Sequence, residues 1–158
     1  MTDGYEPASP FLKAIITEEL PLVGSTFADE NMQRLIAMMR DQDVSNRDWA
    51  TLLVALQDAD TPEIREALLS AARDENDVVR AEALVGLANR DRELALPLVQ
   101  SALAGDSVPM PVFEAATLIA DPRLIDYLKP WTEPSGDDWL DGLARDALAA
   151  CEKGSPLA

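Results

Sequence analysis

The fold is decided by the stretch Asp77–Ala88, which reads DVVRAEALVGLA. Val79, Ala83 and Leu87 recur every four positions in it, so their side chains share one face of a helix. Asp77 is a residue type that caps helix N-termini, because its carboxylate accepts hydrogen bonds from the first unpaired backbone N–H groups. The stretch therefore predicts an amphipathic helix that begins at Asp77.

The same pattern recurs on both sides of this stretch as pairs of helices. The following helix is expected to end at Gly105, a residue type common after helix C-termini. Thr61 is a good N-cap, and Pro62 stands at the first helical position, where its missing N–H costs nothing. Ser45 and Asp48 have the spacing of a capping box. The predicted helices cover residues 45–56, 61–72, 77–88, 92–104, 111–120 and 124–129, flanked by helices at 11–20, 28–40 and 137–151.

The pairs repeat at a regular period. The interval from Arg47 to Arg80 is the same as the interval from Ala50 to Ala83. Helix pairs that repeat about every 30 to 40 residues, as these do, are typical of α-solenoids, in which each pair buries its apolar face only against its neighbours. We therefore predict an all-α fold, a short right-handed α-solenoid with N- and C-terminal capping helices.

This solenoid is expected to form one domain. We assign residues 11–151 to it, with the repeats at 41–130. Residues 1–10 are expected to be a loose N-terminal segment and residues 152–158 a C-terminal tail. A chain of 158 residues is long enough to bury a core without metals or disulfides.

Parts of the chain resemble a known repeat family. Asp77–Ala88 is similar to the first helix of a HEAT repeat, in the small-residue variety also found in phycobilisome lyases and bacterial HEAT-repeat proteins. Leu94–Val99 resembles the second helix of that unit, Ala120–Leu128 resembles the turn and second helix of another, and a third begins at Arg47. The resemblance covers residues 41–130 and implies HEAT-like helix pairs. It implies little about activity, because one scaffold hosts many functions.

Composition supports helices and excludes several classes of function. The chain has 24 Ala and 22 Leu against 9 Val and 6 Ile, which favours helix over strand. Its 29 acidic and 13 basic residues leave a net charge of −16, which argues against binding to a nucleic acid and favours a basic protein partner. No apolar run approaches the length of a membrane span, so we expect a cytoplasmic protein with no membrane contact.

Catalysis and cofactor binding are not expected. The chain has no histidine, which excludes Ser-His-Asp and Cys-His catalysis and removes a common metal ligand. Cys151 is the only cysteine, so no internal disulfide or thiolate metal cage can form. The 7 glycines are scattered and form no phosphate-binding loop. We therefore predict no catalytic residue, no cofactor and no metal.

Several charged and aromatic residues are assigned to structure. Arg47, Arg80 and Arg123 stand near turns, where arginines tie one repeat to the next. Trp49 and Trp139 lie on helical faces and are expected in the core. The acids of the run 133–138 are explained as helix caps rather than as a cation site.

The partner-binding surface is expected on the second helix of each pair, which we take to line the concave face of the stack. Tyr127 and Trp131 are the aromatic anchors of this surface. The predicted partner-binding residues are Glu63, Glu66, Glu93, Gln100, Asp126, Tyr127 and Trp131.

These observations leave three functional readings. The first is a non-catalytic protein–protein interaction module, an adaptor or an inhibitor of the immunity type, that binds a basic protein of bacterial origin such as a toxin. The alternative, which the family resemblance implies, is a bilin lyase-like or other enzyme-accessory protein. A third is a structural module that oligomerises through the open ends of its stack.

Overall fold

The computed structural model describes residues 4–156, and every regular element in that range is helical, which confirms the all-α prediction. The helices are α1 (Pro10–Ile16), α2 (Thr26–Met38), α3 (Val44–Ala55), α4 (Pro62–Ala71), α5 (Asp77–Arg90), α6 (Arg92–Leu103), α7 (Met110–Ile119), α8 (Ile125–Leu128) and α9 (Asp138–Lys153), with 3-10 turns η1 (Pro122–Leu124) and η2 (Lys129–Thr132) on either side of α8. Within residues 4–156, no helix has the length and apolar character needed to cross a bilayer.

Helix starts follow local capping chemistry. Thr61 caps α4 ahead of Pro62, as predicted. The predicted capping box at Ser45 is wrong, because Asp43 caps α3 by accepting from the backbone N–H groups of Ser45 and Asn46. The predicted cap at Asp77 is also displaced by one residue, since Asn76 caps α5. In both cases an Asp or Asn just upstream has the extended backbone that a cap requires.

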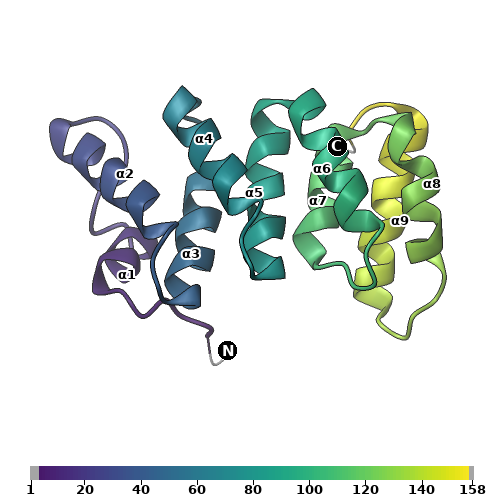
Figure 1. The fold of residues 1–158 in the computed structure, drawn as a ribbon, viewed down its shortest axis with the longest axis horizontal. Coiled ribbons are helices and arrows are strands. Elements are labelled where there is room, and N and C mark those ends of the chain that lie inside the picture. Colours follow the sequence, from purple (N-terminus) through teal and green to yellow (C-terminus); the bar gives the residue numbers. More distant parts are fainter. Residues whose placement is uncertain (1–3, 157–158) are drawn as a thin grey trace.

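The first helices of the successive pairs form one layer. In Figure 1, α3, α5, α7 and α9 stand side by side along the long axis, each in contact with the next. Small residues permit this spacing. A Cβ added at Gly86 of α5 would lie 2.8 Å from Cδ2 of Leu68 and 3.0 Å from Cβ of Ala55. At Gly86, helix α5 therefore packs against side chains of both α3 and α4 with almost no room for an added atom.

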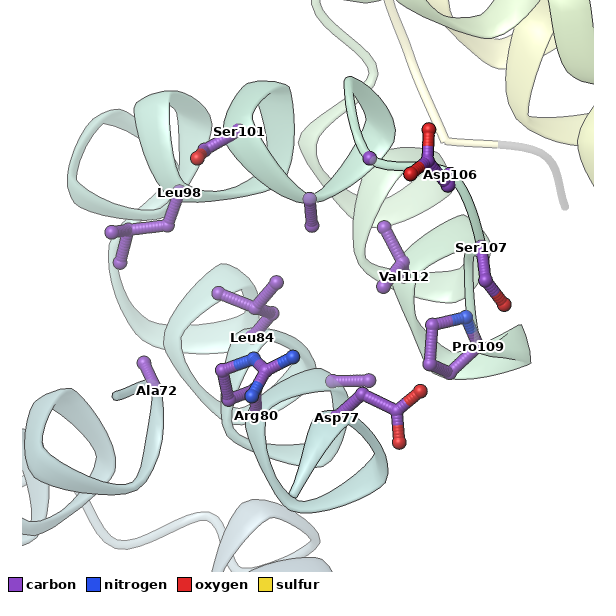
Figure 2. A pocket seen from close by; sticks show the side chains of 13 residues that line it. Ala72, Asp77, Arg80, Leu84, Leu98, Ser101, Asp106, Ser107, Pro109 and Val112 are labelled. Carbon is purple, nitrogen blue, oxygen red and sulfur yellow. The ribbon is translucent and has the colours of Figure 1, made fainter. Parts of the chain in front are cut away.

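The second helices are more widely spaced. Helices α4 and α6 touch at most marginally, as do α2 and α4. The gap beside α6 is open as a groove of about 500 Å³, drawn in Figure 2, between α5, the end of α6 and the connection to α7. A two-layer stack bends toward the layer whose helices lie closer together. We infer that the stack bends toward α3, α5, α7 and α9, whose outward surface we call the concave face; the sequence analysis expected the second helices there.

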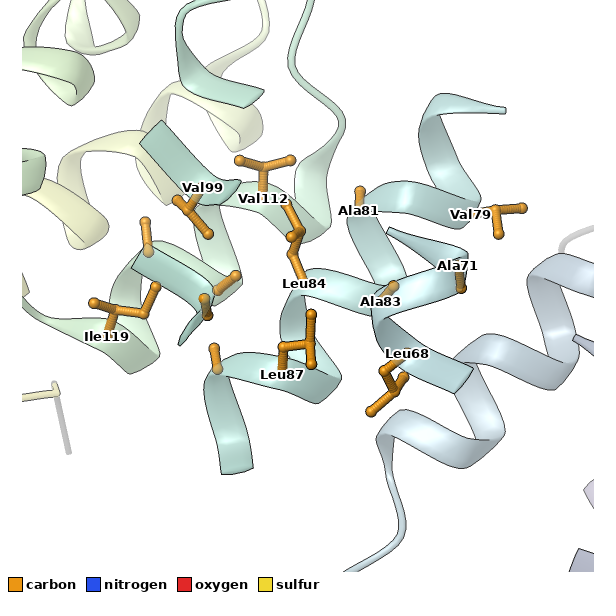
Figure 3. Close-up of a cluster of buried hydrophobic side chains, with 14 of the residues drawn as sticks. Leu68, Ala71, Val79, Ala81, Ala83, Leu84, Leu87, Val99, Val112 and Ile119 are labelled. Atoms are coloured by element: carbon orange, nitrogen blue, oxygen red, sulfur yellow. The ribbon is translucent and has the colours of Figure 1, made fainter. Parts of the chain in front are cut away.

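The hydrophobic core runs without interruption along the stack between the two layers. Figure 3 shows Leu68 of α4, Leu87 of α5, Val99 of α6 and Val112 of α7 directed into this interior. Phe113 is the largest fully buried side chain, at 1% exposure. Each helix contributes one apolar stripe, as the recurrence of apolar residues every four positions in the sequence predicts.

Arginines tie neighbouring units together. Arg47 pairs with Asp74 of the next unit, with its Nε 2.8 Å from the carboxylate. Nη1 of Arg47 donates to the carbonyls of Asp41 and Gln42 before its helix, and Nη1 of Arg80 donates likewise to those of Asp74 and Glu75. Arg123 bonds Glu93 and Asp121, at 2.8 Å each. Arg47 and Arg123 therefore tie neighbouring units as predicted, whereas Arg80 holds the turn that precedes its own helix.

Arg90 makes the densest set of such contacts. Its guanidinium donates to the carbonyl groups of Val54, Ala55, Gln57 and Ala59, and to that of Gly86 in its own helix. It thereby satisfies the unpaired carbonyls at the C-terminal end of α3. Burial lowers the pKa of this guanidinium from its usual value.

The two ends of the stack differ from the prediction in detail. Helix α1 ends at Ile16 rather than Leu20, because the chain turns through Glu18 in the left-handed conformation. Residues 5–9, expected to be loose, are held on α3 by Ser45 and Asn46, which accept from the N–H groups of Ala8 and Ser9. Residues 1–3 of that predicted segment, and residues 157 and 158 of the predicted tail, lie outside the described residues.

Of the two tryptophans expected in the core, Trp139 lies outside it and Trp49 packs against its edge. Trp139 is 64% exposed. Asp141 lies on the buried face of α9, and a residue two positions away on a helix points to the opposite side. Trp49 is half-buried, and its indole N–H donates to the carbonyl of Tyr5 at 3.2 Å.

Candidate functional site

Three carboxylates occupy the same place on three successive first helices. Asp48 lies on α3, Glu82 on α5 and Glu114 on α7, and each step between them is close to the interval from Arg47 to Arg80. Both neighbours are close enough to Glu82 for their negative charge to act on it. We call Asp48, Glu82 and Glu114 the carboxylate row.

The central acid of the row is electrostatically strained. Burial first, and then the charges of Asp48 and Glu114, raise the pKa of Glu82 from 4.5 to about 7. Within residues 4–156, the ion pairs of the protein involve other acids, so no lysine or arginine neutralises this row. A positive charge placed beside Glu82 would relieve the repulsion, so the row favours a cationic ligand.

An aromatic pair stands at the N-terminal end of the row. The rings of Tyr5 and Trp49 stack with their centroids 6.5 Å apart. Burial and the adjacent charge of Asp48 raise the pKa of the Tyr5 phenol, and burial raises the pKa of Asp48 itself. This end of the row therefore presents aromatic surface next to a carboxylate of weakened acidity.

A second, apolar row runs beside the carboxylates. The interval from Leu52 to Val85 equals that from Val85 to Leu118, and these residues lie one helical turn beyond the three acids. All three are partly exposed. The concave face thus carries parallel apolar and acidic rows, an arrangement that suits a ligand with both apolar and basic groups.

The predicted partner-binding residues are distributed over the second-helix layer. Glu63 and Glu66 of α4 line a groove of about 370 Å³ against α2, in which Glu63 accepts from the Gln33 side-chain amide at 2.9 Å. Glu93 of α6 accepts a hydrogen bond from the Arg123 guanidinium, and the side-chain amide of Gln100 donates to the Arg123 carbonyl.

The remaining predicted residues lie near the C-terminal end. Asp126 pairs with Lys129 on the surface, and Tyr127 is exposed at 38% on α8. Trp131 donates its indole N–H to the Leu103 carbonyl and packs edge-on against Phe113 at 6.3 Å. It therefore fastens η2 to the stack. The structure brings Glu63 together with Glu66, and Glu93 together with Gln100, but does not assemble the seven residues into one site.

Sequence reasoning missed the carboxylate row, although a signal for it was present. The steps from Asp48 to Glu82 and from Glu82 to Glu114 nearly equal the helix-pair period seen between Arg47 and Arg80. The missing information was the direction in which the stack bends, since this decides which acids face the concave side.

The groove in Figure 2 has mixed charge. Arg80 and Asp77 belong to α5, and Asp106 and Ser107 stand on the opposite side in the connection to α7. Among residues 4–156, no cluster of acids or cysteine has the arrangement of a metal site. This groove carries both signs of charge, so we do not place the site there.

Comparisons with known proteins support the fold and leave the activity open. Protein YibA from Escherichia coli K12 is 29% identical to this chain over 114 residues, or 72% of this chain and 41% of YibA, and YibA from strain O157:H7 gives the same values. The X-ray structure of E. coli YibA aligns with a TM-score of 0.59 at 23% identity, over 87% of this chain and 54% of that one. The chain thus spans about half or less of these relatives. No protein-family model matches it.

Proposed function

We propose that this chain is a non-catalytic interaction module that binds a basic segment of another protein on the concave face of α3, α5, α7 and α9. The observation that carries the proposal is the carboxylate row, in which Glu82 has a pKa of about 7 and no cation pairs with the three acids among residues 4–156. A lysine or arginine of the partner would supply the missing positive charge.

The net charge of −16 adds a long-range contribution. It attracts a basic partner before contact and speeds association, most strongly at low ionic strength. The apolar row of Leu52, Val85 and Leu118 adds non-polar contact area beside the charges, so binding does not depend on charge alone.

A catalytic use of Glu82 is the less favoured reading. A carboxyl group with a pKa near neutrality suits general acid–base chemistry. However, Glu82 lies on an open face, and the four grooves described in this structure are lined by other residues. Catalysis by a carboxyl group generally needs an enclosed site that excludes water, so the open position favours binding over chemistry. The HEAT-like class, the right-handed twist and a cytoplasmic location remain predictions.

Affinity capture with matched variants tests the proposal. The immobilised protein is exposed to a lysate of the cells that produce it and washed with rising salt, and retained proteins are identified by mass spectrometry. One variant neutralises the concave face (Asp48→Asn, Glu82→Gln, Glu114→Gln). The control removes the same charge from the second-helix layer (Glu63→Gln, Glu66→Gln, Glu93→Gln).

We expect the wild type and the control to retain the same basic protein, and the concave-face variant to lose it. Loss in the control alone would move the site to the second helices. Equal weakening of both variants would reduce the interaction to net charge. Retention of no basic protein at low salt by the wild type would refute the function.

A further inference from the structure

Exposed apolar side chains gather at the N-terminal end of the stack. Ile16, Val23 and Leu56 are 38%, 75% and 65% exposed, and they line a groove of about 430 Å³ between α1, its connection to α2, and α3. A second hollow of about 580 Å³ adjoins it, and the two share Ile16 and Trp49. We call these two adjoining hollows together the terminal groove.

The terminal groove has a built floor and wall. Leu20, Leu22 and Leu53 line it and pack against the core. The connection that forms its outer wall is held by Asn31, whose side-chain amide donates to the Pro21 carbonyl at 2.9 Å. Contiguous apolar surface of this kind marks a binding site more often than isolated exposed residues do.

The surroundings of the terminal groove are acidic. Glu6 and Glu18 line it, and Lys13, the cation in its lining, is paired with Glu6 at 3.2 Å. Tyr5 lines the groove and lies close enough to Asp48 to feel its charge, and Leu52 lines it one helical turn from Asp48, so the groove lies beside the N-terminal end of the carboxylate row. An apolar trough with an acidic border is complementary to a segment that is apolar on one side and basic on the other.

We propose that the terminal groove receives an amphipathic helix of the partner, with its apolar side against Ile16, Val23 and Leu56 and its lysines or arginines over Asp48 and Glu82. This inference rests on the proposed function and names the part of the partner that is recognised. A second copy of this chain is the disfavoured occupant, because it would bring another charge of −16 into contact.

Helical recognition follows from what the groove offers. Residues 4–156 contain no strand, so no strand edge is available there to pair with an extended peptide. Side-chain recognition remains, and a helix places apolar residues at positions i, i+4 and i+7 along one stripe. Such a stripe is about 10 Å long and can present its apolar side chains together to the apolar lining of the groove.

Designed peptides test this inference without knowledge of the partner. The probe is a fluorescent peptide of about 18 residues, long enough to form a helix, with leucines along one face and lysines elsewhere. A scrambled peptide of the same composition has the same charge and no apolar face. Binding is measured by fluorescence anisotropy at low and moderate salt.

Two substitutions at the groove are matched by one at the other end of the stack. Leu56→Glu and Val23→Glu place a charge in the groove at exposed positions on opposite walls, so the fold is expected to survive. Trp139→Glu makes the same charge change on α9, at a side chain that is 64% exposed, close to the value for Leu56. Circular dichroism verifies that all variants are folded.

We expect the helical peptide to bind about tenfold more tightly than the scrambled one, and each groove variant to weaken it about tenfold. Trp139→Glu should change the affinity less than about twofold. Equal binding of both peptides, equal effects of Leu56→Glu and Trp139→Glu, or no binding to the wild type would each overturn the groove inference. Whichever of these results is found, the capture experiment with the carboxylate variants tests the proposed function independently of the groove.

Discussion

Replacing Glu82 with glutamine removes the central charge of the carboxylate row while keeping the size of the side chain. In the wild type, burial and the charges of Asp48 and Glu114 raise the pKa of Glu82 to about 7. A carboxyl group whose pKa is higher in the folded protein than in the unfolded chain destabilises the fold when it ionises. This cost is absent below pH 4.5, grows between pH 4.5 and 7, and is complete above pH 7.

The size of the effect follows from the pKa. Raising it from 4.5 to about 7 corresponds to about 3.4 kcal/mol, at about 1.36 kcal/mol for each pH unit. Glu82 is half-buried, and solvent screens part of its repulsion. We therefore expect Glu82→Gln to stabilise the protein by about 1 to 2 kcal/mol above pH 7, and by progressively less toward pH 5.

Urea unfolding of both proteins over a pH series from about 5 to 8.5 measures this difference. Glu66→Gln on α4 is the control, because that side chain is exposed and its substitution should change the stability by less than about 0.5 kcal/mol. If Glu82→Gln is no more stable than the wild type above pH 7, or if its advantage does not change with pH, the carboxylate row is not under the strain described here.

Three further predictions concern the packing. Gly86→Ala should destabilise the fold by about 1 to 3 kcal/mol in urea unfolding, because its Cβ would press on Ala55, whereas Gly142→Ala on α9 meets nothing within 4 Å and should stabilise it by about 0.5 to 1 kcal/mol. Arg90→Met should cost about 2 to 3 kcal/mol in the same assay, because several carbonyls lose their donor; a loss below about 0.5 kcal/mol would contradict that role. Cys151 should resist alkylation at pH 8 in the native protein and react after unfolding, because it is buried and burial raises the pKa of its thiol to about 11. Mass spectrometry follows the reaction. Rapid alkylation of the native protein would be inconsistent with this burial.

Helix positions were readable from the sequence because they depend on nearby residues. The four-residue recurrence of Val79, Ala83 and Leu87 predicts α5, and the Thr61–Pro62 pair predicts the start of α4. The N-cap residues were predicted less accurately than the helices. Asp43 competes with Ser45, and the winner depends on backbone angles that no short pattern specifies.

The candidate site was not readable in the same way. Its identification depends on which layer is concave, and this depends on side-chain volumes where helices far apart in the sequence come into contact. The chain also has 29 acids, so the spacing of Asp48, Glu82 and Glu114 does not stand out from other acidic spacings. The wrong prediction for Trp139 has the same cause, because helical periodicity alone does not identify which face of α9 the neighbouring helices cover.

The close approach of α5 to α3 at Gly86 links the shape of the stack to its electrostatics. A single carbon atom added at this crossing would push α5 away from α3 and reduce the curvature of the stack. The same displacement would move Asp48 away from Glu82, and the acidity of Glu82 would return toward normal. Under the proposed function, ligand preference would therefore depend on a residue that never touches the ligand.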